Sequence, residues 1–479
     1  MPSSSAPCRR APPLSSTSSL LVTLIPRILP DLRQVANVGI RAMPPLLLID
    51  LCGCCRPHVP SSSSLPISHL TSPYPCLSLL HLICALKGSS LRGKSQAIAG
   101  PGHSIVVTSG GAVYTFGDNS SGQLGLGTLE NQARPQLIRS LQGIRIIQAA
   151  AGGGKTMLVS DTGRVYAFGK DNFGEKVISE NIVSKPQLVE SLKHIFVVQA
   201  AVGHFFTAVL SGEGRVYTFS WGIDEKLGHS TDWTDREPRS LLGPLENLPV
   251  VQIAAGHCYL AALAFQRNRL SVYTVGCGLG GKLAHGFTAD EKYPRLVEYF
   301  NVLNLQPVCL AAGSWHAAVV GRDGRVCTWG WGSCGCLGHG NENYQTLPKV
   351  VKGLNHIKAS YVSVGDCTTF VVSDAGDVYS FGYGESSNLG HIIGVDDQVF
   401  FHLNHATPKL VTSLKITERI VQISPTNMAN FTEAMHTFVL TESGKLYAFG
   451  SGDKGQLGIE FSGQPRIKVY PERVQIDLS

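Results

Sequence analysis

The sequence predicts an all-β protein whose sheets form a seven-bladed β-propeller. Three observations lead to this fold class. One short strand pattern ending in glycine recurs seven times, anchor residues stand at fixed offsets from it, and the chain holds 52 glycines in 479 residues. Because glycine is the residue best suited to tight turns, this excess fits a fold of many short strands.

Each copy of the repeat contains a strand pattern in which valine and aromatic residues alternate before a glycine, as in Val113–Gly117. Such alternation predicts a strand with one buried face. The steps between copies are 51 to 56 residues, except for a last step of 68. The copies begin at Val113, Val165, Val216, Val272, Val326, Val378 and Leu446.

The anchor residues on either side complete the unit. Leucine stands seven residues after the end of six of the seven strands, and a glycine stands 13 residues before the start of five. A proline-led segment and further strand patterns, such as Ile146–Gly152, fill the interval between copies. One unit thus supplies about four strands, and seven units close into a ring without free sheet edges.

The two ends of the repeat array predict how the ring closes. The first unit begins near Ser95 without a proline-led strand, and the chain finishes with an unmatched one at residues 471–476. We therefore expect the N- and C-terminal strands to pair within one blade. Residues 95–479 form the predicted propeller domain.

Residues 1–94 form an irregular N-terminal segment rich in Ser, Pro, Leu and Cys, without the repeat. Its nine Lys and Arg against two acids give a net charge of +7, which leaves residues 95–479 near neutral at −1. A disordered tail or a gene-model artefact is favoured over a targeting peptide, so we expect a cytoplasmic or nuclear protein rather than an organellar one. Its apolar runs fall short of the roughly 18 residues that span a membrane.

The unit resembles the repeat of the regulator-of-chromosome-condensation family, whose members are seven-bladed β-propellers. The first copy carries the resemblance at Gly100, His103 and Ser104 and at the turn Gly122–Gly125, and the likeness covers residues 95–479. It implies a non-enzymatic scaffold that binds a protein partner through loops on one face. The alternative it implies is guanine-nucleotide exchange on a small Ran-like GTPase.

Two further roles within that family are less favoured. A UV-B photoreceptor of this fold would need clustered tryptophans in a Trp-Arg-His pattern, which does not occur, and Trp315 is displaced by one position. A ubiquitin-ligase accessory is disfavoured because no HECT or RING segment follows the repeats. The near-neutral propeller also argues against direct binding of nucleic acid.

Two glycine-rich segments imitate nucleotide-binding motifs. Gly152–Thr156 resembles a phosphate loop, but Ala149 stands where that motif requires glycine. Gly276–Gly281 resembles a dinucleotide fingerprint, but a strand pattern rather than a helix follows it. Both segments occupy turns of the repeat, so we expect no cofactor.

Cysteine and histidine clusters receive structural interpretations. Cys334 and Cys336, with Cys327 nearby, lack the paired C-x-x-C spacing of a metal site. The denser cluster at residues 52–55 is left open. One repeat position holds His103, His316 and His436, and no nucleophile or carboxylate recurs with them, so we expect them to fix turns rather than to catalyse.

The long last step predicts where a partner binds. It contains two excursions, Ile392–His405 and Pro425–Ala434, which interrupt an otherwise regular blade. Irregular loops on a rigid scaffold are common binding sites, although a neutral insertion is the alternative. The predicted partner-binding residues are Asp396, Asp397, Phe400, Phe401, His402 and His405.

Overall fold

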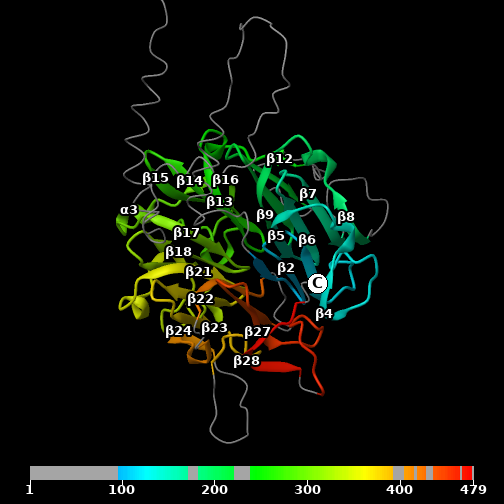
Figure 1. The fold of residues 1–479 in the computed structure, drawn as a ribbon. Coiled ribbons are helices and arrows are strands. Elements are labelled where there is room, and N and C mark those ends of the chain that lie inside the picture. Colours follow the sequence, from blue (N-terminus) through cyan, green and yellow to red (C-terminus); the bar gives the residue numbers. More distant parts are fainter. Residues whose placement is uncertain are drawn as a thin grey trace, which may run out of the picture. The chain divides into compact units, whose positions relative to one another are not determined.

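The computed structural model describes residues 95–170, 182–220, 238–391, 404–414, 418–427, 435–463 and 466–476. The chain divides into two units, Met1–Pro73 and Tyr74–Ser479, and every described residue belongs to the second. In that unit seven four-stranded antiparallel sheets follow one another around a ring (Figure 1). The predicted seven-bladed β-propeller is therefore confirmed.

The strands of the first four blades are β1 (Gln96–Ala99), β2 (His103–Val107), β3 (Val113–Gly117), β4 (Gln132–Leu137), β5 (Ile146–Gly152), β6 (Lys155–Ser160), β7 (Val165–Lys170), β8 (Ile182–Leu188), β9 (Val197–Val202), β10 (Phe206–Ser211), β11 (Val216–Ser220), β12 (Arg239–Ser240), β13 (Val250–Ala255), β14 (Tyr259–Gln266), β15 (Arg269–Gly276) and β16 (Glu291–Leu296). Those of the last three are β17 (Pro307–Ala312), β18 (His316–Gly321), β19 (Val326–Gly330), β20 (Gln345–Val350), β21 (Ala359–Val364), β22 (Thr368–Ser373), β23 (Val378–Gly382), β24 (His405–Leu410), β25 (Ile420–Pro425), β26 (His436–Thr441), β27 (Leu446–Ser451) and β28 (Ile467–Arg473).

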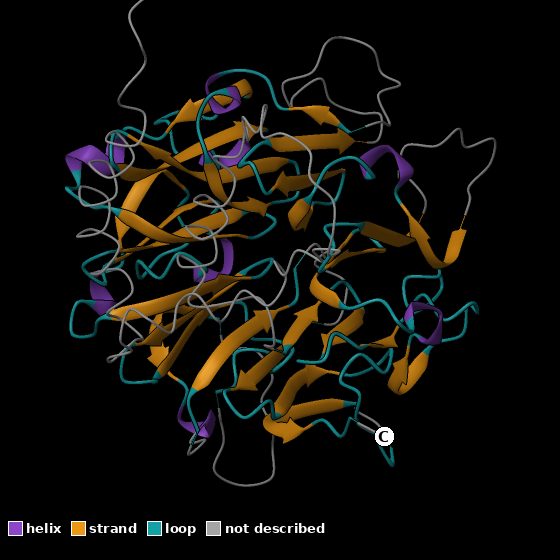
Figure 2. Ribbon diagram, turned by 45° about the horizontal axis from the view of Figure 1, so that its top comes forward, coloured by secondary structure: helices purple, strands orange, loops and turns teal. Residues whose placement is uncertain are grey.

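Within the described residues, helix is confined to short pieces between strands (Figure 2). The one α-helical turn is α3 (Tyr299–Val302). The 3₁₀ turns are η2 (Arg139–Leu141), η3 (Glu190–Leu192), η4 (Pro244–Glu246), η5 (Leu279–Gly281), η6 (Ser333–Gly335), η7 (Lys352–Leu354) and η8 (Thr412–Leu414).

The expected pairing of the two chain ends in one blade is wrong. β1 pairs with β2 and β28 pairs with β27, so each blade is one continuous stretch of chain. The proline-led segment is the fourth, outer strand of a blade rather than the first strand of the next one. Pro135 in β4 and Pro471 in β28 show this. An outer strand tolerates proline because one of its edges forms no sheet hydrogen bonds. The first blade therefore lacks no strand.

Glutamine side chains join the first strands of neighbouring blades. At the junction of the last and first blades, the Gln422 Oε1 atom accepts a hydrogen bond from Ala97 N at 3.0 Å, and its Nε2 donates to Ala97 O at 2.9 Å. Gln148, Gln199 and Gln252 make the same two-point bridge to the next blade. Gln96 makes a related bridge to two residues, donating to Ile147 O and accepting from Ala149 N. The ring thus closes through side chains rather than through a shared sheet.

Three buried histidines form a second set of links between blades. Their Nε2 atoms lie 2.8 to 3.0 Å from a hydroxyl of the next blade, in the pairs His103–Thr156, His316–Thr369 and His436–Ser104. Each hydroxyl donates its one proton to a backbone carbonyl, so each Nε2–H must be the donor. Burial lowers the pKa of all three histidines, which favours the neutral ring. The histidines thus form hydrogen bonds as expected, but they link neighbouring blades in addition to contacting their own loops, as the 3.4 Å distance from His103 Nδ1 to Pro101 O shows.

Aromatic packing explains the glycine that follows the anchor leucine. Phe116 of β3 is fully buried and meets Phe438 of the last blade edge-on at a centroid distance of 5.9 Å. A Cβ atom at Gly458, whose φ is +67°, would lie 2.8 Å from the Phe116 ring. Gly125 lies in the same way against Phe168. Because this glycine has no side chain, the aromatic ring of the next blade can pack against it.

Replacing Gln422 with alanine should lower the free energy of unfolding by about 1–3 kcal/mol, because both backbone groups of Ala97 lose their partners in a half-buried place. Urea denaturation followed by tryptophan fluorescence measures the change. Gln136→Ala, at an exposed position of β4, is the matched control and should cost less than about 0.5 kcal/mol. Equal losses for both variants would contradict a specific role of the bridge.

Mild acid should destabilise the ring through its buried histidines. Burial lowers the pKa values of His103, His316 and His436 from 6.5 to about 4, 3 and 3. Below pH 6.5 the unfolded chain therefore binds more protons than the folded chain, and stability falls as the pH drops toward 4.

Each of these histidines should lower the free energy of unfolding by about 1.4 kcal/mol for each unit that the pH falls in that window. Unfolding free energies measured at pH 7.5 and pH 5.0 give the slope. His316→Gln removes one such group, so its stability should fall less on acidification than that of the wild type. Parallel pH profiles for the two proteins would show that His316 is not held neutral.

Candidate interaction surface

The long loops of the propeller gather at one end. Because the four strands of each blade are antiparallel, the loop after the first strand and the loop after the third lie at the same end. The third loops are long, for example residues 118–131 and 331–344, whereas the second loops are tight turns such as residues 322–325. We call this end the long-loop face.

Five aromatic rings form a cluster on the long-loop face of blades three to five. His204 stacks on His257 at 4.6 Å, and His257 stacks on Trp315 at 5.0 Å. Phe205 meets both histidines edge-on at 4.6 and 4.9 Å. Trp331 meets Trp315 at 6.1 Å and is 39% exposed. We call these five residues the aromatic cluster.

Backbone hydrogen bonds hold the loops that carry the cluster. His204 N donates to His257 O at 3.2 Å, and His257 N donates to Ser314 O at 3.3 Å, so the first loops of three successive blades are tied together. Burial, with smaller effects of His204 and Lys282, lowers the pKa of His257 to about 4. The His257 ring is therefore neutral at pH 7 and stacks without the cost of burying a charge.

Lys282 supports the cluster from the interior. Its side chain is fully buried, and its Nζ atom lies 5.0 Å from the ring centroid of Trp315 and 5.8 Å from that of Tyr259. An ammonium group over aromatic faces is attracted by their negative π-surfaces. This position differs between copies of the repeat, with Gln123 in the first and Lys226 in the third.

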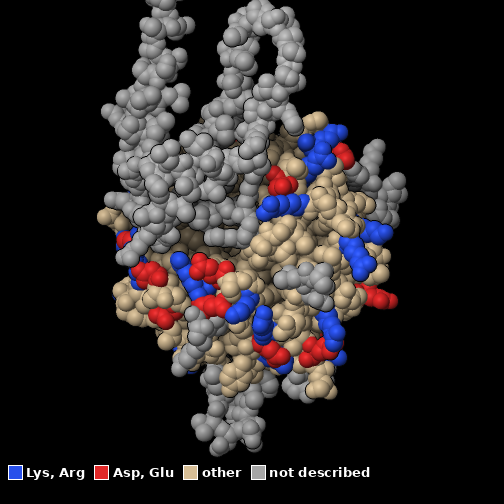
Figure 3. Space-filling model, in the orientation of Figure 1, with Lys and Arg blue, Asp and Glu red and all other residues tan. Residues whose placement is uncertain are grey.

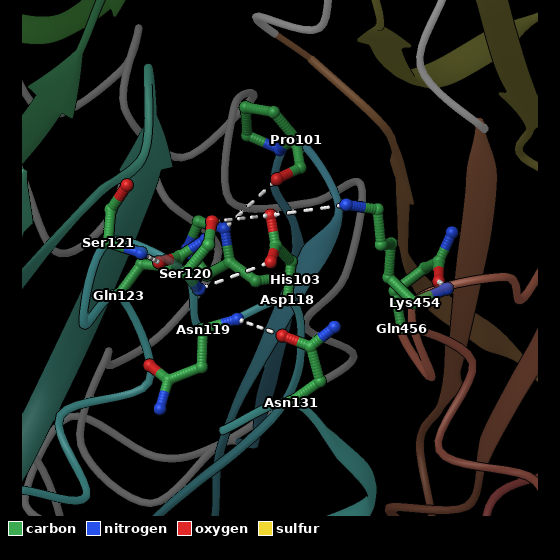
Figure 4. A network of polar contacts seen from close by, with 10 residues as sticks. All are labelled: Pro101, His103, Asp118, Asn119, Ser120, Ser121, Gln123, Asn131, Lys454 and Gln456. Atoms are coloured by element: carbon green, nitrogen blue, oxygen red, sulfur yellow. Dashed lines mark hydrogen bonds and ion pairs between the residues drawn. The ribbon is translucent and has the colours of Figure 1, made fainter. Parts of the chain in front are cut away.

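Polar contacts order the opposite side of the same face, between blades one and seven (Figure 4). The Gln123 Oε1 atom accepts a hydrogen bond from Ser121 N, and the Gln456 Oε1 atom accepts one from Lys454 N, both at 2.8 Å. Lys454 Nζ lies 3.9 Å from the Asp118 Oδ2 atom. The glutamine of the Gly-Gln-Leu-Gly turn thus fixes the loop that contains it.

The structure describes one of the six predicted partner-binding residues, His405. Asp396, Asp397, Phe400, Phe401 and His402 lie outside the described residues, and their role stays a prediction.

His405 is described, and it opens β24 opposite Gly382. Its ring meets that of His391 edge-on at 4.7 Å, and the His391 Nε2 atom lies 2.9 Å from the Ser380 hydroxyl. Burial lowers the pKa of His405, so its ring packs in the neutral form. His405 therefore belongs to the root of the loop on the long-loop face.

Sequence reasoning missed the aromatic cluster. The signal lies in the two residues after the anchor glycine, at least one of which has a ring in three successive copies: His204-Phe205, His257-Cys258 and Ser314-Trp315. The first two copies hold Pro101-Gly102 and Gly153-Gly154 there. A search for shared motifs passes over such positions because they are where the copies differ.

Charged side chains of both signs lie on the described surface. Basic and acidic side chains are interspersed on the described surface seen in Figure 3. Among the described residues, no group of three or more His, Cys, Asp or Glu side chains could hold a metal ion, and no helix is long and apolar enough to cross a membrane. The two glycine-rich segments are blade turns as predicted, since Gly152–Thr156 joins β5 to β6 and Gly276–Gly281 leads from β15 into η5.

Comparison with known proteins places the chain in a family. The model of the RCC1-like domain matches residues 81–428, and the model of the regulator of chromosome condensation (RCC1) repeat matches residues 436–456. This chain belongs to the RCC1-like family. The resemblance carried by the repeat is therefore confirmed.

Curated relatives of this RCC1-like chain differ in how much of their own length it matches. The E3 ubiquitin-protein ligase HERC2 of Homo sapiens is 30% identical over 351 residues, which are 73% of this chain but 7% of HERC2. The ultraviolet-B receptor UVR8 of Arabidopsis thaliana is 27% identical over 383 residues, 79% of this chain and 82% of the receptor. This chain thus spans only a small part of the length of HERC2.

Solved structures share the fold. Prp20p from Saccharomyces cerevisiae, whose structure was described with its binding to Gsp1p and histones, has a TM-score of 0.62 at 20% identity, covering 80% of this chain and 88% of Prp20p. Human WBSCR16 has a TM-score of 0.63 at 20% identity, covering 76% of this chain and 94% of its own. At this identity the likeness concerns the fold alone.

Proposed function

We propose that this RCC1-like propeller is a non-enzymatic protein-binding module whose partner docks on the long-loop face over the aromatic cluster. The observation that carries the proposal is the column of three stacked rings, which stands on hydrogen-bonded loops. The exposed Trp331 lies at an angle against the last of these rings. Tryptophan and other aromatic side chains on rigid supports are enriched at the centres of protein interfaces.

The neighbouring surface extends the apolar area of the cluster. Leu279 in the third loop of blade four is 53% exposed, and a Cβ atom at the adjacent Gly280 would lie 2.6 Å from the Trp331 ring. The insertion 392–405 is anchored on the same face, because it joins the end of β23 to the start of β24. We therefore include Phe400 and Phe401 in the proposed surface as a second contact.

Guanine-nucleotide exchange on a Ran-like GTPase is the alternative function. It rests on the shared fold with Prp20p, whose described partners are Gsp1p and histones. The aromatic cluster fits either function, because an exchange factor also acts by docking on its GTPase. The ligase activity named for HERC2 is not proposed, since this chain matches 7% of that protein.

Replacing Phe205 and Trp331 together with alanine should weaken partner binding by about 30-fold or more, the loss of a hot spot of about 2 kcal/mol. Affinity capture with quantitative mass spectrometry identifies partners, and calorimetry with the purified partner measures the loss. Val302→Ala in α3, 72% exposed at the opposite end of the ring, is the matched control and should keep every partner. Retention of all partners by a folded double variant would refute the proposed face.

The same proteins separate the two functions. If the captured partner is a small GTPase, release of a fluorescent guanine nucleotide from it is measured with wild-type and double-variant propeller. Accelerated release that disappears in the double variant would favour exchange. Tight binding without accelerated release would favour the scaffold.

A further inference from the structure

Two cysteines stand opposite each other directly behind the aromatic cluster. In the hairpin of β14 and β15 the last paired residues are Tyr259 and Gly276, and Cys258 and Cys277 are the next residues on each strand. Cys277 N donates a hydrogen bond to Cys258 O at 2.9 Å, and the two thiols hydrogen-bond to each other. Facing residues of antiparallel strands have the spacing that a disulfide requires.

A buried positive charge lies beside this thiol pair. Lys282 Nζ donates to the Cys258 Sγ atom at 3.4 Å, and the lysine side chain is fully buried against Trp315 and Tyr259. The hydrogen bond from the Cys258 thiol, with a smaller effect of Lys282, lowers the pKa of Cys277 to about 6. A lowered pKa favours the thiolate, which is the reactive form of a thiol.

The thiols are accessible to a small oxidant. Both side chains are half-buried rather than enclosed, in contrast to Cys327, which is buried in β19. Cys258 also follows His257 directly, so the pair belongs to the wall of the aromatic cluster. A covalent bond between the two would therefore alter the loop that carries one of the stacked rings.

We propose that Cys258 and Cys277 form a peroxide-oxidised thiol pair, reversibly closed as a disulfide. The Cys277 thiolate sulfur attacks one oxygen of hydrogen peroxide; the O–O bond breaks, hydroxide leaves, and Cys277 becomes a sulfenic acid. The Cys258 sulfur then attacks the Cys277 sulfur; the S–S bond forms and the S–O bond breaks. The first hydroxide takes up the proton that Cys277 released on ionising, and the second takes the Cys258 proton. Two thiols thus lose two electrons, and the peroxide is reduced to two waters.

A second thiol pair in the same face serves as an internal comparison. The thiols of Cys334 and Cys367 also hydrogen-bond to each other. The hydrogen bond from the Cys367 thiol lowers the pKa of Cys334 as well, but the nearby charges are those of Glu342 and Glu385, which raise it. Cys367 is also buried, whereas Cys258 and Cys277 are both half-buried. The Cys258–Cys277 pair should therefore oxidise faster than the Cys334–Cys367 pair.

The full-length protein is treated with hydrogen peroxide, blocked with N-ethylmaleimide, digested without reductant and mapped by mass spectrometry. We expect a linked peptide pair containing Cys258 and Cys277 that dithiothreitol separates and that appears about tenfold faster than any Cys334–Cys367 link. Reduced, alkylated Cys258 and Cys277 after oxidation of the other pair would overturn the proposal. This outcome is independent of partner binding, so it does not decide the proposed function.

Two variants test the order of the steps. Cys258→Ser should leave the oxidised Cys277 without a partner, so dimedone should trap its sulfenic acid in the variant but label the wild type little. Cys327→Ser is the control and should behave as the wild type. Equal dimedone labelling of Cys277 in wild type and Cys258→Ser would overturn the role of Cys258.

The contribution of Lys282 is tested first in the wild-type protein and then in a variant. The rate of Cys277 alkylation by iodoacetamide in the wild-type protein should reach half its maximum at a pH well below the ordinary thiol value of 9.0. Lys282→Met should move that midpoint upward. A wild-type midpoint near the ordinary thiol value of 9.0 would overturn the proposal.

Discussion

Closure of the ring depends on a glutamine bridge between blades, which occurs among the described residues at five of the seven junctions, including the one between the last and first blades. The sheets of adjacent blades face one another, so no backbone ladder runs between them. A primary amide carries both a donor and an acceptor, and it can therefore satisfy the N–H and the C=O of one residue across that gap. Gln422 does this for Ala97 where the last blade meets the first, and the ring closes without a shared blade.

The same junctions hold the long-loop face in place. His316, which links blade five to blade six, directly follows Trp315 of the aromatic cluster, so the tryptophan is attached to a locked position. Lys282 and the tied first loops add support from the interior. A rigid ring therefore presents a preorganised set of aromatic rings, which reduces the entropy lost when a partner binds.

Much of the fold was predictable because its repeat is periodic. The number of blades follows from seven copies of one strand pattern, but the limits of each blade do not, because a strand pattern does not state which neighbour it pairs with. Pro471 was therefore assigned to the first blade, whereas it belongs to the last. The position of Gln96, four residues before Gly100 as Gln148 is before Gly152, marks the true first strand.

The binding surface was less predictable than the fold. The aromatic cluster arises from residues that differ between copies, and only the ring brings Phe205 and Trp331 onto one face. The insertion containing Phe400 and Phe401 was visible from its length alone, and its contribution remains a prediction. The thiol pair could not be seen at all, because Cys258 and Cys277 become neighbours only through the pairing of β14 with β15.

Native-state hydrogen exchange followed by mass spectrometry tests closure of the ring most directly, because an opened junction exposes its backbone amides. Peptides covering β1 and β25 at the junction are compared with those covering β9 and β13, which meet inside the array. A ring closed by Gln422 predicts equally slow exchange in all four strands. Fast exchange of β1 and β25 beside protected β9 and β13 would show that the ring is open between the last blade and the first.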